Sequence, residues 1–177
     1  MRRPLVLLTL VASVSVAASA CGSDDDTASS APGASEQAES DAPVEMIDVA
    51  TGETSTLDDA LTPTDGKPLL AWFWAPFCPT CRGEAPELDA FMAENSNRVT
   101  MVGIGARNDL EYAEEFLGTT GVSNFPLLWD ASGESWVDNA VAAQPYMILF
   151  DSEGEEVQRW PGGASVVQIE NALAELG

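Results

Sequence analysis

The chain has 177 residues, of which 45% are hydrophobic, so it is long enough for one domain with a buried core. It carries 29 acidic residues against 7 basic ones, and its formal net charge is −22. A charge of this sign and size makes nucleic acid and anionic lipid headgroups poor partners. The chain contains no histidine and only three cysteines, which limits the metal sites that it can form.

Residues 1–20 have the pattern of a secretory signal peptide. Two arginines precede an apolar run that is too short to remain in a membrane as a spanning helix. The next segment, ASAC, resembles the lipobox of bacterial lipoproteins, which implies that Cys21 is lipidated and becomes the mature N-terminus. Ordinary cleavage nearby is the alternative, and it would leave Cys21 as a free thiol. Loss of the peptide removes Arg2 and Arg3 and changes the net charge from −22 to −24.

Residues 21–42 are predicted to form a flexible acidic tether. After Cys21 they are rich in Ser, Ala, Asp and Glu, and they contain no aromatic or large aliphatic residue. Such a segment buries too little apolar surface to offset the entropy lost on ordering. We therefore expect a signal peptide, a tether that begins with a lipidated cysteine, and a folded domain over residues 43–177.

The folded domain begins with a pattern of two short strands around a turn at Gly52, followed by a brief helical turn. The next segment, KPLLAWFWAPF, is an apolar run between Pro68 and Pro76, which is typical of a central strand buried on both faces. The remaining pattern predicts a mixed sheet with helices on both faces. In chain order it comprises a helix at 78–95, a strand at 98–106, a helix at 108–121, a strand and turn at 125–133, a short helix at 135–140, hairpin strands at 146–150 and 156–160, and a helix at 165–176.

Single residues predict how these helices begin, bend and pack. Pro79 stands just inside the first long helix, where its missing N–H costs nothing, whereas Pro86 lies further in and should kink it. Asp109 is the expected N-cap of the next helix, which should end near Gly118 or Gly121. The last helix should face the core with four apolar residues at helical spacing, namely Val166, Ile169, Leu173 and Leu176.

The motif C-P-T-C places Cys78 and Cys81 two residues apart. The pair cannot complete a metal site from this chain, because four ligands are needed and only Cys21 is left over. A disulfide across two residues removes little entropy from the unfolded chain, so it would make a poor structural staple. The pattern therefore predicts a redox-active dithiol that needs no metal or other cofactor.

The two cysteines are expected to have different roles. Cys78 ends the strand and opens the helix, where free N–H groups and the helix dipole favour its thiolate, so it should be the exposed attacking thiol. Attack on a partner's disulfide gives a mixed disulfide, which Cys81 resolves, and the reverse path oxidises a partner dithiol. Cys81 should be more buried and should need help to lose its proton. Glu84 lies three residues further along, on the same side of the helix.

Five segments of the chain carry a family resemblance: FWAPFCPTC, CRGEAPEL, VGIGARND, FPLLWDASG and QPYMILFDSEG. Together they resemble the thioredoxin fold and, within it, the TlpA-like and DsbE-like extracytoplasmic thiol-disulfide oxidoreductases, including the secreted ones of actinobacteria. The resemblance covers residues 44–176. It implies an α/β fold in which a central mixed sheet is flanked by helices on both faces. Copper-binding relatives of the fold need a histidine and a wider cysteine spacing, which this chain lacks.

The resemblance also implies roles for residues near the dithiol. In thioredoxin a buried Asp on the preceding strand assists the second cysteine, and the matching position here is Trp72, which cannot take a proton. Glu84 matches a glutamate of TlpA-like proteins, so it is expected to handle the proton of Cys81; the alternative is a solvated helix acid. Pro145 matches the cis-proline that faces the disulfide, and Gln144 before it should contact substrate. An ordinary trans proline at a strand start is the alternative.

The expected substrate surface also includes residues close to the cysteines. Trp74 and Phe77, together with Trp160, are expected to form an apolar rim for unfolded or flexible partners. Pro79 and Thr80 lie between the cysteines and should contact the same partners. The two aromatic residues that we expect in the core instead are Trp72 and Phe73.

The function that the resemblance implies is disulfide exchange with exported cysteine-containing proteins, with another redox protein recharging the dithiol. The enzyme would be attached to the outer face of the cytoplasmic membrane by a lipid on Cys21, or secreted without one. The alternative is a dedicated reductant in cytochrome c maturation that acts on apocytochrome, and the sequence leaves the direction of electron flow open. A thiol peroxidase would need a Thr where Ala75 stands, and a non-catalytic binding lipoprotein would have no need of the C-x-x-C motif.

Overall fold

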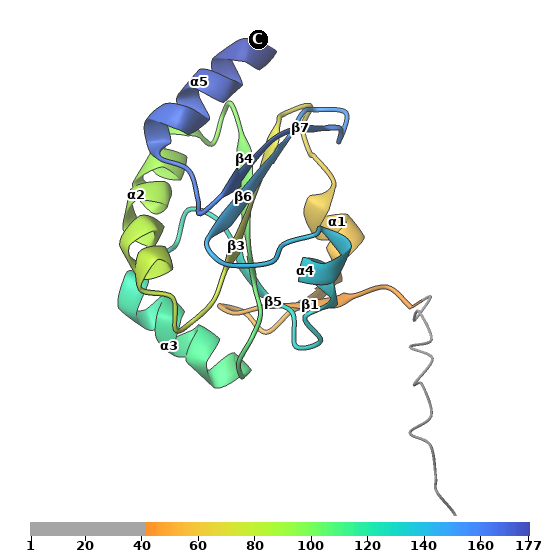
Figure 1. Ribbon diagram of the computed structural model, residues 1–177, viewed down its shortest axis with the longest axis vertical. Coiled ribbons are helices and arrows are strands. Elements are labelled where there is room, and N and C mark those ends of the chain that lie inside the picture. Colours follow the sequence, from red (N-terminus) through yellow and green to blue (C-terminus); the bar gives the residue numbers. More distant parts are fainter. Residues whose placement is uncertain (1–41) are drawn as a thin grey trace, which may run out of the picture. The chain divides into compact units, whose positions relative to one another are not determined.

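The computed structural model describes residues 42–177 (Figure 1). The expected signal peptide at 1–20, the lipidation site at Cys21 and all but the last residue of the expected tether lie outside the described residues. Within the described range, no helix is both long enough and apolar enough to cross a membrane.

One mixed sheet of seven strands forms the centre of the described domain (Figure 1). In chain order the strands are β1 (Glu45–Asp48), β2 (Thr54–Thr56), β3 (Leu69–Trp74), β4 (Thr100–Gly105), β5 (Leu127–Trp129), β6 (Tyr146–Phe150) and β7 (Glu156–Pro161). Their order across the sheet is β2-β1-β5-β4-β3-β6-β7. The three central strands β3, β4 and β5 are parallel to one another, and the outer strands on each side pair antiparallel.

Helices cover both faces of this sheet, as the sequence predicted. They are α1 (Leu57–Leu61), α2 (Pro79–Asn95), α3 (Leu110–Thr120), α4 (Glu134–Asp138) and α5 (Val166–Leu176). Figure 1 shows α2, α3 and α5 over one face and α1 and α4 over the other. The crossovers β3-α2-β4 and β4-α3-β5 step across the sheet in the same direction, so crossovers of the same hand place α2 and α3 on the same face.

The strand β3 leads into the cysteine motif, and all six of its residues are buried. It pairs with β4 on one side and β6 on the other, so its successive side chains enter opposite halves of the core. Phe73 packs edge-on against Trp136 and Tyr146, with ring centroids 6.2 and 6.5 Å apart. Trp74, on the opposite face, stacks on Phe116 of α3 at 4.3 Å. Burial on both faces explains why the apolar run is unbroken.

Two glycines of β4 leave room for Trp74. A Cβ atom at Gly105 would lie 2.6 Å from Cζ2 of Trp74 and 3.1 Å from Cε3 of Trp129. A Cβ atom at Gly103 would lie 2.5 Å from Cδ2 of Leu127 and 3.1 Å from Nε1 of Trp74. Core atoms pack at van der Waals separations, so the space that Trp74 fills exists because these two positions have no side chain.

The predicted boundaries of the long helices are confirmed. Pro79 is at the start of α2, and the helix continues past Pro86 to Asn95. The kink expected at Pro86 stays a prediction. Asp109 is the N-cap residue of α3, although its side chain makes no capping hydrogen bond. Gly121, at a φ of 70°, is the C-cap of α3, whereas Gly118 lies inside the helix.

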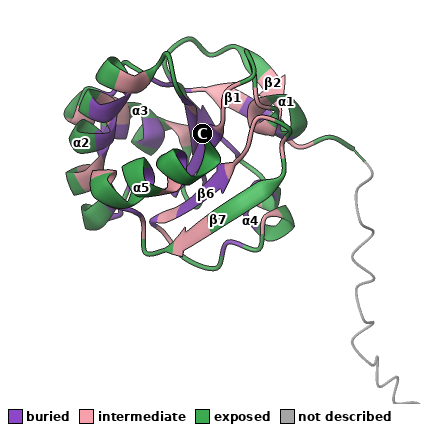
Figure 2. Cartoon of the chain, turned by 90° about the horizontal axis from the view of Figure 1, so that it is seen from above, coloured by how far each residue is buried: buried purple, intermediate pink, exposed green. Residues whose placement is uncertain are grey.

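The predicted packing of α5 is partly wrong. Ile169 and Leu173 are buried as expected, and Val166 is half-buried. Leu176, the last residue of the helix, is 36% exposed. Figure 2 shows that the outer side of α5 and much of the edge strand β7 are exposed.

Candidate active site

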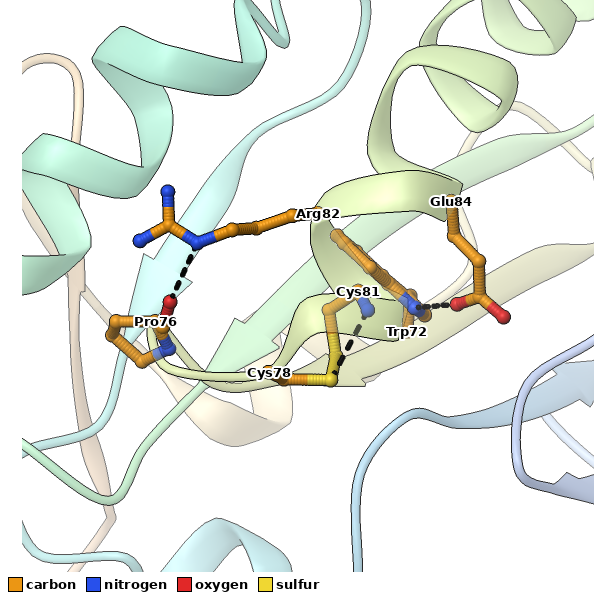
Figure 3. The surroundings of a disulfide bond; sticks show 6 residues. All are labelled: Trp72, Pro76, Cys78, Cys81, Arg82 and Glu84. Atoms are coloured by element: carbon orange, nitrogen blue, oxygen red, sulfur yellow. Dashed lines mark hydrogen bonds between the residues drawn. A yellow bond between two sulfur atoms is a disulfide. The ribbon is translucent and has the colours of Figure 1, made fainter.

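The disulfide between Cys78 and Cys81 lies where β3 turns into α2 (Figure 3). The backbone N–H of Cys78 donates to the carbonyl of Ala75 at 3.1 Å, which closes the turn after the strand. Cys78 is the N-cap residue of α2, and Cys81 belongs to its first turn. Their Cα atoms are 5.3 Å apart, a separation that a disulfide can bridge.

The start of α2 favours a negative charge on the sulfur of Cys78. The backbone N–H of Cys81 donates to Sγ of Cys78 at 3.1 Å, so the sulfur stands where the side-chain oxygen of an N-cap residue usually stands. Pro79 occupies the first helical position and leaves no N–H unpaired there. The positive end of the helix dipole acts in the same direction. These groups stabilise the Cys78 thiolate once the disulfide opens.

The prediction that Cys78 is an exposed thiol is wrong for the disulfide form. Cys78 is 4% exposed, and Cys81 is fully buried. The bond to Cys81 and the hydrogen bond from its N–H both direct the Cys78 sulfur back over the first turn of α2. Of the two sulfur-bearing residues, Cys78 is still the one that reaches the surface.

Glu84 lies one turn beyond Cys81 on α2 and is half-buried. Its Oε2 accepts a hydrogen bond of 3.1 Å from the indole N–H of Trp72, which joins α2 to β3 (Figure 3). Burial raises the pKa of the Glu84 carboxyl above its ordinary value, the hydrogen bond from Trp72 offsets part of this, and the nearby charge of Glu87 adds to it. A raised pKa suits a carboxyl that takes up and returns a proton.

Trp72 is a core residue, as predicted, but it also holds Glu84. The side chain is fully buried, and its indole N–H is directed at the Glu84 carboxylate (Figure 3). The sequence indicated that Trp72 stands where thioredoxin has a buried acid. That match was the only sign in the sequence of a link between Trp72 and the proton-handling group. The sequence could not show that the indole of Trp72 on β3 lies within hydrogen-bond distance of the Glu84 carboxyl on α2, 12 residues later.

Arg82 is a second residue whose role the sequence did not reveal. Its Nε donates to the carbonyl of Pro76 at 3.1 Å (Figure 3). Its Nη1 donates to Oγ1 of Thr119 at 2.9 Å. The guanidinium also lies 5.5 Å from the ring centroid of Phe116. Arg82 therefore fixes the loop before Cys78 to α3. Its partner on α3 is 37 residues away, and no local pattern marks that pairing.

The proline loop lies beside the end of β3. The peptide bond between Gln144 and Pro145 is cis, which confirms the prediction. Tyr146 pairs with Phe73, so the residue before Tyr146 stands at the edge where β3 leads to the cysteines. Gln144 is half-buried, and within the described part of the chain its Oε1 has no hydrogen-bond partner.

The residues predicted to form the substrate surface differ in their exposure. Phe77 is 54% exposed, and Pro79 and Thr80 are exposed, so these three are accessible beside the disulfide. Trp74 is fully buried in the core and cannot form part of an exposed rim, so that prediction is wrong. Both faces of β3 are covered, so none of its three aromatic residues reaches the surface. Trp160 is half-buried on β7.

Across residues 42–177, no three cysteine, aspartate or glutamate side chains are grouped in a way that could hold a metal ion. The chemistry that the arrangement offers is that of the dithiol, the thiolate-stabilising start of α2, and one half-buried carboxyl.

Comparisons with known proteins agree with this chemistry. The chain is similar to the soluble secreted antigen MPT53 of Mycobacterium tuberculosis, with 39% identity over 89 residues, which are 50% of either chain. The chain thus spans about half the length of this curated relative. It also resembles a solved structure of a secreted Mycobacterium tuberculosis disulfide oxidoreductase that is described as homologous to Escherichia coli DsbE. The TM-score is 0.61 and the identity 30%, over 75% of this chain and 95% of that one.

A further solved structure shares the fold of this chain. It is the exposed lipoprotein thioredoxin of Streptococcus pneumoniae, with a TM-score of 0.65 and 25% identity, over 76% of this chain and 100% of that one. The architecture is therefore the thioredoxin-like α/β fold that the sequence implied. The Redoxin family profile matches residues 28–173, which is most of the chain. The chain belongs to the Redoxin family.

Proposed function

We propose that the chain is an extracytoplasmic thiol-disulfide oxidoreductase of the DsbE-like type that exchanges disulfides with exported cysteine-containing proteins. The observation that carries this proposal is the Cys78–Cys81 disulfide at the start of α2, where the N–H of Cys81 supports the sulfur of Cys78. The name of the solved Mycobacterium tuberculosis relative, a secreted disulfide oxidoreductase, supports the same activity.

In the reducing direction, the Cys78 thiolate attacks one sulfur of a partner's disulfide. A bond forms between Cys78 and that sulfur, and the other partner cysteine leaves as a thiolate. Cys81 then attacks Sγ of Cys78, which forms the Cys78–Cys81 bond and releases the second partner cysteine. Two electrons pass from the chain to the partner. The oxidising direction is the reverse of these steps.

Glu84 is the proposed proton carrier for Cys81. The thiol of Cys81 is fully buried and reacts only after it loses its proton, which Glu84 accepts. In the reverse direction Glu84 returns the proton to the Cys81 thiolate that leaves the disulfide. The half-buried position and the raised pKa of the Glu84 carboxyl support this assignment.

A partner would dock on the exposed residues beside the disulfide. Phe77, Pro79 and Thr80 offer an accessible surface on the α2 side. Gln144 and Pro145 precede β6, whose first residue pairs with Phe73 near the end of β3, and the partner's extended backbone would pair there.

The same proposal includes the location of the protein. A signal peptide at residues 1–20 and a lipid on Cys21 would attach the domain to the outer face of the cytoplasmic membrane, and an unlipidated form would be secreted. The names of two relatives, a secreted antigen and an exposed lipoprotein, support an extracytoplasmic site. A separate redox protein would recharge the dithiol.

A trapping experiment tests the exchange activity. In the full chain with Cys81→Ser, Cys78 has no resolving partner, so reduced protein mixed with insulin should accumulate a mixed disulfide that dithiothreitol cleaves. The matched control, Cys78→Ser with Cys81→Ser, retains Cys21 and measures adducts formed there. An equal yield of adduct from both variants would overturn the proposal.

The reduction potential of the Cys78–Cys81 pair decides the direction. A potential near those of strong oxidants would favour disulfide formation in exported proteins, and oxidation of reduced ribonuclease A should then exceed reduction of insulin. A strongly reducing potential with the opposite ranking would favour the dedicated reductant that acts on apocytochrome.

A further inference from the structure

Gly163 lies directly against the carboxyl group of Glu84. It belongs to the loop that joins β7 to α5, and its φ is +85°. A Cβ atom at this position would lie 2.9 Å from Cδ and 3.0 Å from Oε2 of Glu84, and closer still to Oε1. Real Cβ atoms do not approach other heavy atoms so closely, so Glu84 occupies space that any side chain at position 163 would need.

The Glu84 carboxylate is therefore enclosed from two directions. On one side, the indole N–H of Trp72, a residue of β3, donates to Oε2 of Glu84. On the other side, the backbone of Gly163, in the loop after β7, lies against the same carboxylate. This loop is itself fixed, because the N–H of Gly163 donates to the carbonyl of Trp160 at 3.2 Å. The contact with Gly163 also accounts for part of the burial of Glu84, a residue on a helix surface.

We propose that Gly163 is a positioning residue for proton transfer at Cys81, because its missing side chain leaves the space that the Glu84 carboxylate needs beside Trp72. The inference rests on the proposed role of Glu84 as the proton carrier. In this proposal Gly163 acts only through the carboxylate.

The chain supplies a matched control at the adjacent position. Gly162 has a φ of +92°, so an alanine there strains the backbone much as one at position 163 does. A Cβ atom at Gly162 would meet no atom within 4 Å, whereas one at Gly163 would meet Glu84. Gly162→Ala therefore reports the backbone strain alone, and Gly163→Ala reports the strain together with displacement of the carboxylate.

The first measurement follows the carboxyl group itself. Carbon-detected NMR titration of Glu84 in the full chain should give a midpoint above that of an exposed glutamate in the wild type and in Gly162→Ala. In Gly163→Ala the carboxylate should move toward water, and its midpoint should fall toward the ordinary value, since burial is the largest cause of the shift. Equal midpoints in the two alanine variants would overturn the inference.

The second measurement follows the Cys81 step. Reduced protein reacts with dithiobis(nitrobenzoate) at Cys78, and the subsequent first-order release of coloured thiolate reports attack by Cys81. At neutral pH, Gly163→Ala should slow this release on the order of tenfold relative to Gly162→Ala, which is a fraction of the hundredfold or more that a positioned base contributes. In a Glu84→Gln background the two alanine variants should release thiolate at the same rate.

The Glu84→Gln variant separates failure of the inference from failure of the proposed function. If Glu84→Gln alone releases thiolate at the wild-type rate, the proton role of Glu84 is wrong, and so is the inference built on it. If Glu84→Gln slows release but Gly163→Ala behaves as Gly162→Ala does, only the positioning role is overturned. Slowing by Gly163→Ala that persists in the Glu84→Gln background would also overturn it.

Discussion

At the scale of single residues, Trp72 acts on the ionisation of Glu84. An indole N–H can donate but cannot accept, so Trp72 stabilises the ionised form of Glu84 and never takes the proton itself. Burial acts in the opposite direction and is the larger effect, which leaves the pKa of Glu84 above its ordinary value of 4.5. Trp72 therefore limits a shift that burial would otherwise make larger.

The variant Trp72→Phe tests this balance through its pH dependence. The folded pKa of Glu84 lies above the unfolded one, so the contribution of Glu84 to stability is greatest below about pH 4.5 and declines as the pH rises through the folded pKa. Removal of the N–H raises the folded pKa further. Trp72→Phe should therefore lose about 0.5–1 kcal/mol more, relative to wild type, at about pH 7 than at about pH 4.

Urea unfolding at both pH values measures this difference. The packing lost with the indole ring costs the same at either pH, so only the hydrogen bond contributes to the change. In a Glu84→Gln background the difference between the two pH values should vanish. A loss of stability that is independent of pH in both backgrounds would show that the hydrogen bond does not act on the ionisation of Glu84.

At the scale of elements, the β3–β4 pair is shaped by one large residue and the glycines opposite it. Trp74 lies over β4, and its ring leaves least room for a side chain at Gly105. The ring is fully buried and cannot rotate aside to make room. At Gly103 the nearest obstacle is a methyl group of Leu127, which can shift. The exposed glycine of α3, Gly118, has no atom near the site of a Cβ.

Alanine substitutions at these positions should have effects of opposite sign. Gly105→Ala should lower the free energy of unfolding by about 1–3 kcal/mol through overpacking against Trp74. Gly118→Ala should raise it by about 0.5–1 kcal/mol, because alanine favours the helix and meets nothing there. Chemical denaturation measures the free energy of unfolding of each variant. A Gly105→Ala protein as stable as wild type would contradict the packing described for Trp74.

The elements whose signals are local were predicted correctly from the sequence. The apolar run of β3, the Gly52 turn, the N-cap at Asp109 and the hairpin of β6 and β7 each depend on residues near them in the chain. The cis bond before Pro145 followed from the family resemblance.

The incorrect predictions concerned exposure. The sequence placed Trp74 at the surface and predicted an exposed thiol at Cys78, yet Trp74 is fully buried and Cys78 is buried in the disulfide form. Exposure depends on which distant elements cover a residue, and neither the α3 helix over Trp74 nor the loop of Gly163 against Glu84 leaves a local pattern. For the same reason the contact between Trp72 and Glu84 could not be predicted.

At the scale of the whole molecule, the dominant property is negative charge. The net charge is −22, and the described part has five cationic side chains. Arg82 and Arg159 are held by hydrogen bonds within the fold, to Pro76 and Asn139 among others. The overall field therefore attracts cationic partners and repels anionic ones, over a range that salt shortens.

Salt should accordingly affect charged disulfides in opposite ways. Between about 0.01 M and 0.15 M salt the screening length falls from about 30 to 8 Å, so the reaction of reduced protein with cystamine, a dication, should slow several-fold. The reaction with anionic dithiobis(nitrobenzoate) should accelerate, and that with neutral hydroxyethyl disulfide should change little. Stopped-flow rates measure all three, and salt dependences of the same sign for cystamine and the anionic reagent would contradict steering by the net charge.

The fit between Trp74 and Gly105 also restricts how this sequence can diverge. A side chain at position 105 meets the ring of Trp74, whereas a smaller residue at position 74 would leave a cavity that such a side chain could fill. The two positions are therefore coupled: either change alone costs stability, and the second change costs less once the first has been made. Among descendants of this chain, a side chain at position 105 should therefore occur together with a smaller residue at position 74.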